Sequence, residues 1–295
     1  MSWAKITEQQ NPVSSHIDEK TTAEILGIIN REDMGVPQAV KDSLLGIKAF
    51  IDALFPRFKD GGRLFYVGSG TSGRLGVLDA AECPPTFRTD PEMVQGIIAG
   101  GYDALVRSIE GAEDYPEDGA KIIIEYNITA DDIVLGITAS SSTPFVLGAL
   151  EKAKKTGALT GLIICNKPLQ LDYVDHIISI IVGSEVISGS TRMKAGTATK
   201  LVLNMLTTTL MIKINKTYGN LMVDLKASNK KLWDRGARII THLTGLDYDD
   251  SLQLLKSANG EVKTAIVMEK KKCTYGEGVQ LLQSVSGSLK KVLGE

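Results

Sequence analysis

The sequence predicts an α/β protein, a parallel sheet in a three-layer sandwich, followed by a small C-terminal three-helix bundle. Two observations lead to this prediction. Between residues 63 and 182, short apolar runs bounded by Gly, Pro, Ser or Asn alternate with helical stretches, which is typical of parallel strands joined by crossover helices. After Gly245, the spacing of apolar residues indicates only short helices. The chain has 295 residues, which suffices for one large domain or two small ones.

The elements of the predicted core follow from hydrophobic periodicity. Helices are expected over 21–30 and 37–58, and buried strands over 63–67, 93–99, 132–138, 161–165 and 176–182. Connecting helices are expected over 73–82, 102–110 and 143–155, and Pro84 and Pro85 should stop the first of them. A long helix over 191–214 has few charges and should lie deep in the protein or at a subunit contact.

We therefore divide the chain into four parts. These are an N-terminal helical segment that packs on the core (1–60), the core itself (61–225), a connecting helix (226–245) and the C-terminal bundle (246–295). In the bundle, Asp249 or Asp250 should cap the first helix and Gly260 should end it. Two further helices are expected after Gly260, the last one running to the C-terminal end.

Composition argues against several functional classes. Lysine and arginine number 33 against 35 acidic residues, so neither nucleic acid nor an anionic membrane is an expected partner. The longest charge-free stretch, 133–150, contains five hydroxyl side chains and a proline and is not a membrane span. No export signal is evident, and three widely spaced cysteines fit a reducing cytoplasm. The three histidines have no metal-ligand spacing, so we expect no metal, and any catalysis should rely on carboxylates and hydroxyls.

A glycine-rich loop, GSGTSG at 68–73, follows a predicted strand and opens a predicted helix. It matches the dinucleotide pattern G-x-G-x-x-G, with Asp90 near the position of a ribose-binding acid, so a nicotinamide-dependent oxidoreductase is one alternative. Ser69, Thr71 and Ser72, however, add three hydroxyls to the backbone amides of a helix N-terminus. That combination suits a compact dianion such as a phosphomonoester.

Two more hydroxyl clusters occur at predicted strand-to-helix turns: Ser140, Ser141, Ser142 and Thr143, and then Ser188, Ser190 and Thr191. Each cluster alone is equally well explained as helix capping. Together, at the carboxyl side of one parallel sheet, they favour a phosphomonoester pocket. Lys194 and Arg192 either neutralise the anion there or form surface salt bridges.

Two glutamates are candidate acid–base residues. Glu82 ends the helix opened by the glycine-rich loop, where an acid opposes the helix dipole. Glu113 lies in EGAEDY, after the second predicted strand. For both, a surface glutamate is the commoner explanation.

At these residues the sequence resembles the N-acetylmuramic acid 6-phosphate etherase family, and the resemblance spans nearly the whole chain. It rests on GSGTSGRLGVLDAAECPPTF (68–87), IAGGYDALVRSIEGAEDYPEDGA (98–120), SEVISGSTRMKAGTATKLVLNMLTT (184–208) and KTYGNLMVDL (216–225). The resemblance implies a sugar isomerase (SIS) domain and a ubiquitin-associated-like C-terminal bundle. It also implies a homodimer with the active site near the subunit interface.

The reaction implied by the resemblance is cleavage of the D-lactyl ether of N-acetylmuramic acid 6-phosphate, by elimination of lactate and addition of water, without a cofactor. Glu82 matches the family's proton-donating glutamate and Glu113 its second catalytic glutamate. We expect burial against Pro84, Pro85 and Phe87 to raise the pKa of Glu82. The family usually has arginine where this chain has Ser142, so a cation is missing beside the second hydroxyl cluster.

Two alternatives share the predicted fold. One is a non-catalytic phosphosugar-sensing regulator, similar to the glucokinase regulatory protein, which has two SIS domains. The other is an aldose–ketose phosphosugar isomerase, which also removes a proton from carbon 2. The AECPPT and GAEDY motifs favour the etherase.

Overall fold

The computed structural model describes residues 5–168 and 170–295, which form two compact units. The first unit extends to Ala81 and resumes over Pro91–Leu206, and the second comprises Glu82–Asp90 and Thr207–Glu295. The chain passes from one unit to the other within helix α4 (Gly70–Phe87), between Asp90 and Pro91, and within helix α7 (Lys194–Lys213). Each unit has its own hydrophobic core.

Among its described residues, the first unit contains a five-stranded sheet with strand order β2-β1-β3-β4-β5. All neighbouring strands are parallel. Every residue of β1, β3 and β4 is buried, which explains their continuous apolar sequences. The strands confirm the predicted positions: β1 (Leu64–Gly68), β2 (Val94–Ile98), β3 (Ile133–Ile137), β4 (Leu159–Ile164) and β5 (His176–Ser179).

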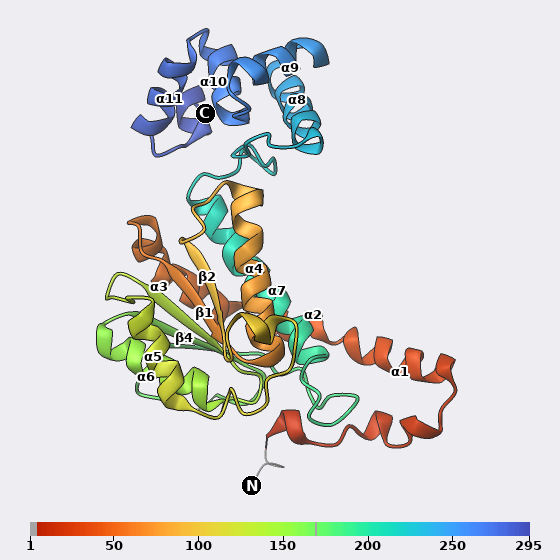
Figure 1. Ribbon diagram of the computed structural model, residues 1–295. Coiled ribbons are helices and arrows are strands. Elements are labelled where there is room, and N and C mark those ends of the chain that lie inside the picture. Colours follow the sequence, from red (N-terminus) through yellow and green to blue (C-terminus); the bar gives the residue numbers. More distant parts are fainter. Residues whose placement is uncertain (1–4, 169) are drawn as a thin grey trace. The chain divides into compact units, whose positions relative to one another are not determined.

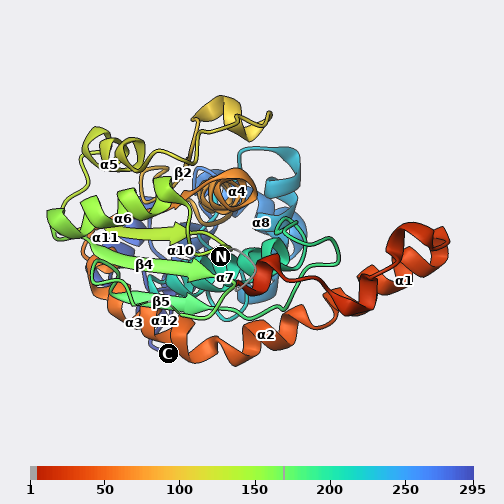
Figure 2. The same cartoon turned by 90° about the horizontal axis from the view of Figure 1, so that it is seen from below.

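Helices cover both faces of this sheet (Figures 1 and 2). On one face, α6 (Pro144–Thr156) packs on β1, β3 and β4, and α5 (Pro116–Glu125) packs on α6. On the other face, α3 (Leu44–Lys59) contacts β3 and β5, while Gly76 of α4 lies against Tyr66 of β1. The three-layer sandwich is therefore confirmed.

The segment between β2 and β3 differs from the prediction. A helix over 102–110 was expected, but only a 3-10 turn forms there, Tyr102–Leu105. Tyr102 and Val106 are 83% and 76% exposed, so these apolar residues have no core to pack on and the helix prediction is wrong. Helix α5, which the sequence did not predict, follows instead.

The N-terminal helices begin with α1 (Thr22–Asp33), which a reciprocal capping box between Thr21 and Glu24 starts. The single helix expected over 37–58 is two helices, α2 (Val36–Asp42) and α3. They meet at Ser43, whose hydroxyl donates to the carbonyls of Ala39 and Ser179. Such side-chain bonding to the backbone competes with regular helix, and here it also fastens the break to the end of β5.

The prediction that Pro84 and Pro85 end helix α4 is wrong, because the helix continues to Phe87. Both prolines lie in its last turns, where their fixed φ is compatible with helix although each removes an N–H bond and crowds the carbonyl four residues before it. Arg88 closes the helix in the left-handed conformation (φ 51°), with its N–H donating to the Pro84 carbonyl at 2.9 Å.

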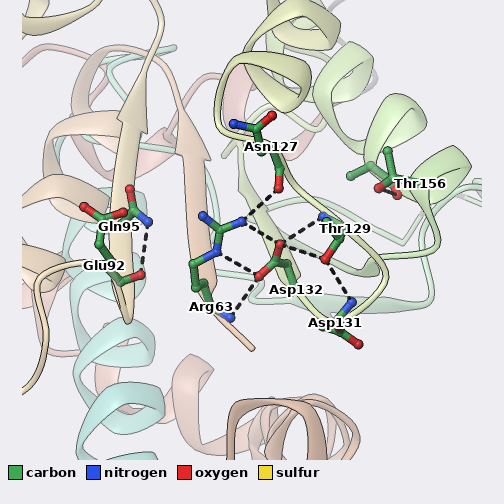
Figure 3. Close-up of polar contacts among 9 residues, drawn as sticks. Arg63, Glu92, Gln95, Asn127, Thr129, Asp131, Asp132 and Thr156 are labelled. Atoms are coloured by element: carbon green, nitrogen blue, oxygen red, sulfur yellow. Dashed lines mark hydrogen bonds and ion pairs between the residues drawn. The ribbon is translucent and has the colours of Figure 1, made fainter. Parts of the chain in front are cut away.

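At the amino ends of β1 and β3, a polar network fixes the pairing of the two strands (Figure 3). The Arg63 guanidinium donates to both carboxylate oxygens of Asp132, at 3.0 and 2.8 Å. The same carboxylate accepts the backbone N–H groups of Arg63 and Thr129. This network lies at the opposite end of the sheet from the hydroxyl-rich turns.

The second unit is helical: α8 (Lys230–Thr244), α9 (Tyr248–Ser257), α10 (Val262–Lys271), α11 (Tyr275–Ser284) and α12 (Leu289–Leu293). Helix α8 shares one core with the following helices. The expected last helix is two helices, because Ser286 and Gly287 both adopt positive φ between them. The cap of α9 is Asp247, whose side chain accepts from the N–H of Asp250, so the predicted cap is wrong.

Candidate active site

The hydroxyl-rich turns after β1 and β3 lie at the point where the strand order reverses. The chain runs from β1 outward to β2 and then returns to place β3 on the other side of β1. In parallel sheets, ligands bind in the crevice outside the carboxyl ends of the strands at such a point. Ser69 directly follows β1, and Thr138 directly follows β3.

A cavity of about 330 Å³ opens beside Ser69 in the first unit. Its wall includes Glu113, and the Ser69 hydroxyl donates to Oε2 of Glu113 at 2.5 Å. The structure thus brings together two predicted site residues from separate segments. A carboxylate held by a hydroxyl at the edge of a cavity is suited to proton transfer with a bound ligand.

Two arginines that the sequence analysis did not select also line this cavity. Arg74 of α4 donates to the carbonyls of Leu105 and Arg107, at 3.0 Å each, and so ties the loop after β2 to α4. Arg107 lines the cavity from that loop and is exposed. Both arginines reach the cavity because the loop after β2 contacts α4, and their spacing in the sequence gave no reason to select them.

The second hydroxyl cluster forms a connected chain of hydrogen bonds. The Thr138 hydroxyl lies 2.7 Å from that of Thr143 and 3.3 Å from that of Ser140, and Ser140 lies 3.2 Å from Ser142. Ser141 does not join this chain, because its hydroxyl donates to the Ser140 carbonyl. Ser141 is buried, and its backbone has a positive φ of 62°. Of the four predicted hydroxyls at this turn, those of Ser140, Ser142 and Thr143 therefore belong to one hydrogen-bonded chain.

This second cluster adjoins the cavity through the backbone of Glu113. The Glu113 carbonyl accepts the N–H of Phe145, in the first turn of α6, at 3.0 Å. Thr143 is the N-cap of the same helix, and its side chain makes no capping bond. The candidate catalytic glutamate is consequently attached to the turn that carries the hydroxyls.

The third cluster is oriented differently. Ser188 donates to the Gln9 carbonyl at 3.5 Å and lines another hollow, of about 710 Å³, shared with residues 10–18. Ser190 and Thr191 are half-buried just before α7.

In the glycine-rich loop, Ser72 is half-buried, and the methyl group of Thr71 lies 3.4 Å from where a Cβ on Gly196 would stand. The glycine-rich loop therefore adjoins the start of α7, while Ser188 faces the N-terminal segment.

Lys194 is only 4% exposed, and its ammonium forms an ion pair with Glu32 at 2.6 Å. Its charge is therefore neutralised within the chain. Nearby, the buried Glu185 accepts the N–H groups of Lys194 and Ala195 and caps α7. Burial raises the pKa of Glu185, although these two backbone bonds act in the opposite direction.

Glu82 is exposed, so the expectation that Pro84, Pro85 and Phe87 bury its carboxyl is wrong for the single chain. Helix α4 directs Asp79 and Cys83 inward, and Glu82 does not share their buried face. The residue belongs to the part of α4 that lies in the second unit.

Curated relatives match this chain over almost its full length. An N-acetylmuramic acid 6-phosphate etherase from Rhodopirellula baltica is 49% identical over 288 residues, covering 97% of this chain and 95% of the relative. One from Clostridium acetobutylicum is 50% identical with the same coverages. The chain belongs to the N-acetylmuramic acid 6-phosphate etherase family.

A family model and a solved structure also match parts of the chain. Residues 47–154 match the family model of the glucokinase regulatory protein N-terminal SIS domain, so the expected SIS fold of this etherase family member is confirmed. The solved structure of a ligand complex of c3406 from E. coli CFT073 superimposes with a TM-score of 0.49 and 17% identity, covering 68% of this chain and 97% of that one.

Two classes of feature are absent from the described part of this etherase family member. Residues 5–168 and 170–295 contain no group of three or more His, Cys, Asp or Glu side chains placed to hold a metal ion. Within the same ranges, no helix combines the length and apolar character needed to cross a bilayer.

Proposed function

We propose that this chain cleaves the D-lactyl ether of N-acetylmuramic acid 6-phosphate, with water, to N-acetylglucosamine 6-phosphate and D-lactate. Family membership supports the reaction. The ether oxygen is a poor leaving group, so the open-chain aldehyde must first acidify the proton on carbon 2. A base removes that proton, lactate leaves from carbon 3, and water adds across the resulting double bond. The reaction therefore needs positioned acid–base groups.

The observation that carries the proposal is the Ser69–Glu113 pair in the cavity at the switch point of the sheet. We assign proton transfer to Glu113, and to Ser69 the orientation of its carboxylate. The linked hydroxyls of Ser140, Ser142 and Thr143 hold the 6-phosphate, which supplies several acceptor oxygens to neutral donors. We also assign Thr71, Ser72, Ser190 and Thr191 to the adjoining part of this site, supported by the proximity of Thr71 to Gly196 at the start of α7. Ser141, Ser188 and Lys194 are assigned supporting roles, because their side chains bond within the chain.

Glu82 is assigned as the second acid–base residue, supported by its match to the family motif in AECPPT. Because it is exposed, its carboxyl needs a covering surface to exclude water. We assign that surface to a second copy of the chain in a homodimer. Helix α1 supports a dimer, since only Ile28 of its residues is buried and Leu26 is 62% exposed. A helix of 12 residues with so little burial gains most of its stability from a further contact.

The decisive experiment incubates the purified full chain with N-acetylmuramic acid 6-phosphate and measures D-lactate without added metal or nucleotide. Stoichiometric release of D-lactate and N-acetylglucosamine 6-phosphate is expected. Tight binding without release would instead identify a phosphosugar sensor. Formation of a ketose phosphate would identify an isomerase.

Substitution of the two glutamates tests their assignment. Glu113→Gln and Glu82→Gln keep the shape of the side chain but remove its acid–base function, so each should lower kcat by about 10²-fold or more. Glu125→Gln, an exposed residue at the end of α5, is the control and should retain activity. Retention of most lactate release by either catalytic variant would remove that residue from the mechanism.

The dimer is tested by the mass of the protein in solution. Wild-type protein should have twice the mass of one chain in light scattering. Leu26→Glu, which places a charge on the exposed side of α1, should shift the mass toward that of the monomer. A wild-type mass of one chain would contradict the dimer. A cytoplasmic location also stays a proposal, supported by the small number and wide spacing of the cysteines in the sequence.

A further inference from the structure

A lysine from the N-terminal segment reaches the second hydroxyl cluster. The Lys5 ammonium donates to the Ser142 hydroxyl at 2.5 Å, although 137 positions separate the two residues. Ser142 lies 3.2 Å from Ser140, which continues the hydrogen-bonded chain toward Thr138. A cation is thus present at a turn whose own residues are all neutral.

The backbone that carries Lys5 is fastened to the sheet by one buried side chain. Asn166, only 4% exposed, accepts the N–H groups of Ile6 and Thr7, at 2.7 and 3.4 Å. Its amide nitrogen donates to the Thr7 hydroxyl at 3.2 Å and to the Ala139 carbonyl at 2.9 Å. Since Ala139 belongs to the same turn as the hydroxyls, Asn166 positions the N-terminal segment directly against that turn.

The charge of Lys5 is not balanced within the described part of the chain. The two most deeply buried lysines each have an acid partner: Lys194 pairs with Glu32, and Lys263 pairs with Asp224. No carboxylate among the described residues lies within ion-pair distance of Lys5, and two of the three donors of its ammonium remain after the bond to Ser142. Lys5 also stands beside the N-terminal turn of α6, where a helix dipole favours negative charge and opposes a cation.

Such an arrangement is stabilised when an anion lies between the ammonium, the hydroxyls and the helix N-terminus. We propose that Lys5 is a substrate-binding residue whose ammonium neutralises the 6-phosphate held by Ser140, Ser142 and Thr143. This inference rests on the proposed function, because it takes the substrate to be a phosphosugar bound at this turn. It assigns a charge-bearing role to a residue far from the glycine-rich loop in sequence.

The substrate also carries a lactyl carboxylate, and the product distinguishes the two anions. N-acetylglucosamine 6-phosphate retains the phosphate but lacks the carboxylate, so its binding reports on the phosphate alone. Binding of this product by calorimetry is therefore the primary measurement, and it does not require turnover.

Lys5→Met, which keeps the apolar stem and removes the charge, should weaken product binding tenfold or more. It should raise KM for N-acetylmuramic acid 6-phosphate by a similar factor and change kcat less than threefold. Lys5→Arg should restore most of the affinity. Lys41→Met, an exposed residue of α2, is the matched control and should bind as the wild type does. Added salt should weaken binding more steeply in the wild type than in Lys5→Met.

Unchanged product affinity in Lys5→Met, with the wild-type unfolding temperature, would overturn the proposal. Weaker binding of the substrate by Lys5→Met, with unchanged binding of the product, would also overturn the proposal, because it would place Lys5 at the lactyl carboxylate. If the wild type binds the product but releases no lactate, the proposed function fails while the assignment of Lys5 is still decided by binding. A wild type that releases lactate but does not bind the product would overturn the assignment of Lys5 and leave the proposed function standing.

Discussion

The carboxylate of Asp132 shows how much one side chain contributes at the amino end of the sheet. It is buried and accepts two bonds from the Arg63 guanidinium and two from backbone N–H groups (Figure 3). Burial alone would raise the pKa of Asp132, but the bonds from Arg63 and Thr129 outweigh it and lower the pKa below its usual value. The charged form is therefore the one that stabilises the fold.

Replacing that charge tests this conclusion. Asp132→Asn should reduce the free energy of unfolding by about 2 kcal/mol at pH 7, because it removes charge-assisted bonds in a buried site. Glu151→Gln breaks an exposed pair with Lys155 and should cost less than about 0.5 kcal/mol. Urea denaturation of both variants measures the difference, and equal losses would show that burial is irrelevant here.

The same carboxylate predicts a pH dependence. A lowered pKa in the folded state means that the stabilisation is complete above the unfolded pKa of about 3.9 and is lost as pH falls through the folded value. The difference in unfolding free energy between wild type and Asp132→Asn should therefore shrink below about pH 4. A difference that stays constant from pH 7 to pH 3 would contradict the role of the charge.

At the scale of the secondary-structure elements, Gly119 of α5 and Gly148 of α6 allow these two helices to pack closely. A Cβ on Gly148 would stand 2.1 Å from the Pro116 carbonyl oxygen, and one on Gly119 would stand 1.9 Å from that of Phe145. Both obstacles are backbone atoms, which cannot move aside without shifting a helix. This packing also holds the N–H of Phe145 near the Glu113 carbonyl, so it supports the candidate site.

Gly148→Ala should therefore destabilise the protein by about 3 kcal/mol through overpacking. Gly27→Ala in α1 makes the same chemical change where nothing lies within 4 Å. It should raise stability by about 0.8 kcal/mol through helix propensity. Thermal unfolding of the two variants gives the comparison, and a destabilised Gly27→Ala with a neutral Gly148→Ala would refute the packing argument.

At the scale of the whole molecule, the second unit is assembled from two separate parts of the sequence. Within it, Arg88 donates to Glu261 at 2.7 Å, and the Arg88 carbonyl accepts from Lys216 at 3.3 Å. Arg88 holds the left-handed conformation that glycine usually supplies at a helix end, and these contacts offset that strain. The pair fastens Glu82–Asp90 to the helical core of the same unit.

Arg88→Gln should lower the stability of the second unit by about 1 kcal/mol, since its ion pair is only partly exposed. Arg238→Gln breaks an exposed pair with Asp234 and should cost less. The chain has two tryptophans, so a Trp3→Phe background leaves Trp233, in α8, as the only tryptophan, and its fluorescence reports on this unit. Equal denaturation midpoints for the two variants would contradict the role of Arg88.

The strands and most helices could be predicted because their evidence is local. Continuous apolar runs identify strands buried on both faces, and the Thr21–Glu24 capping box marks the start of α1. Helix α5 also has local signals that the sequence analysis missed, namely Pro116 at its start and the acids Glu117 and Asp118 in its first turn. The exposure of Glu82 was mispredicted because neighbouring apolar residues do not determine which side of a helix faces the core.

By itself, the sequence determined the fold class, the family, the strand positions and the residue types available for chemistry, since these depend on periodicity and on long local motifs. Only the tertiary structure decided which of those residues meet. It joined Ser69 to Glu113, paired Lys194 with Glu32 and brought Lys5 to Ser142. Each of these contacts depends on the strand order and on helix packing, which arise from the burial of the whole core and not from any single segment.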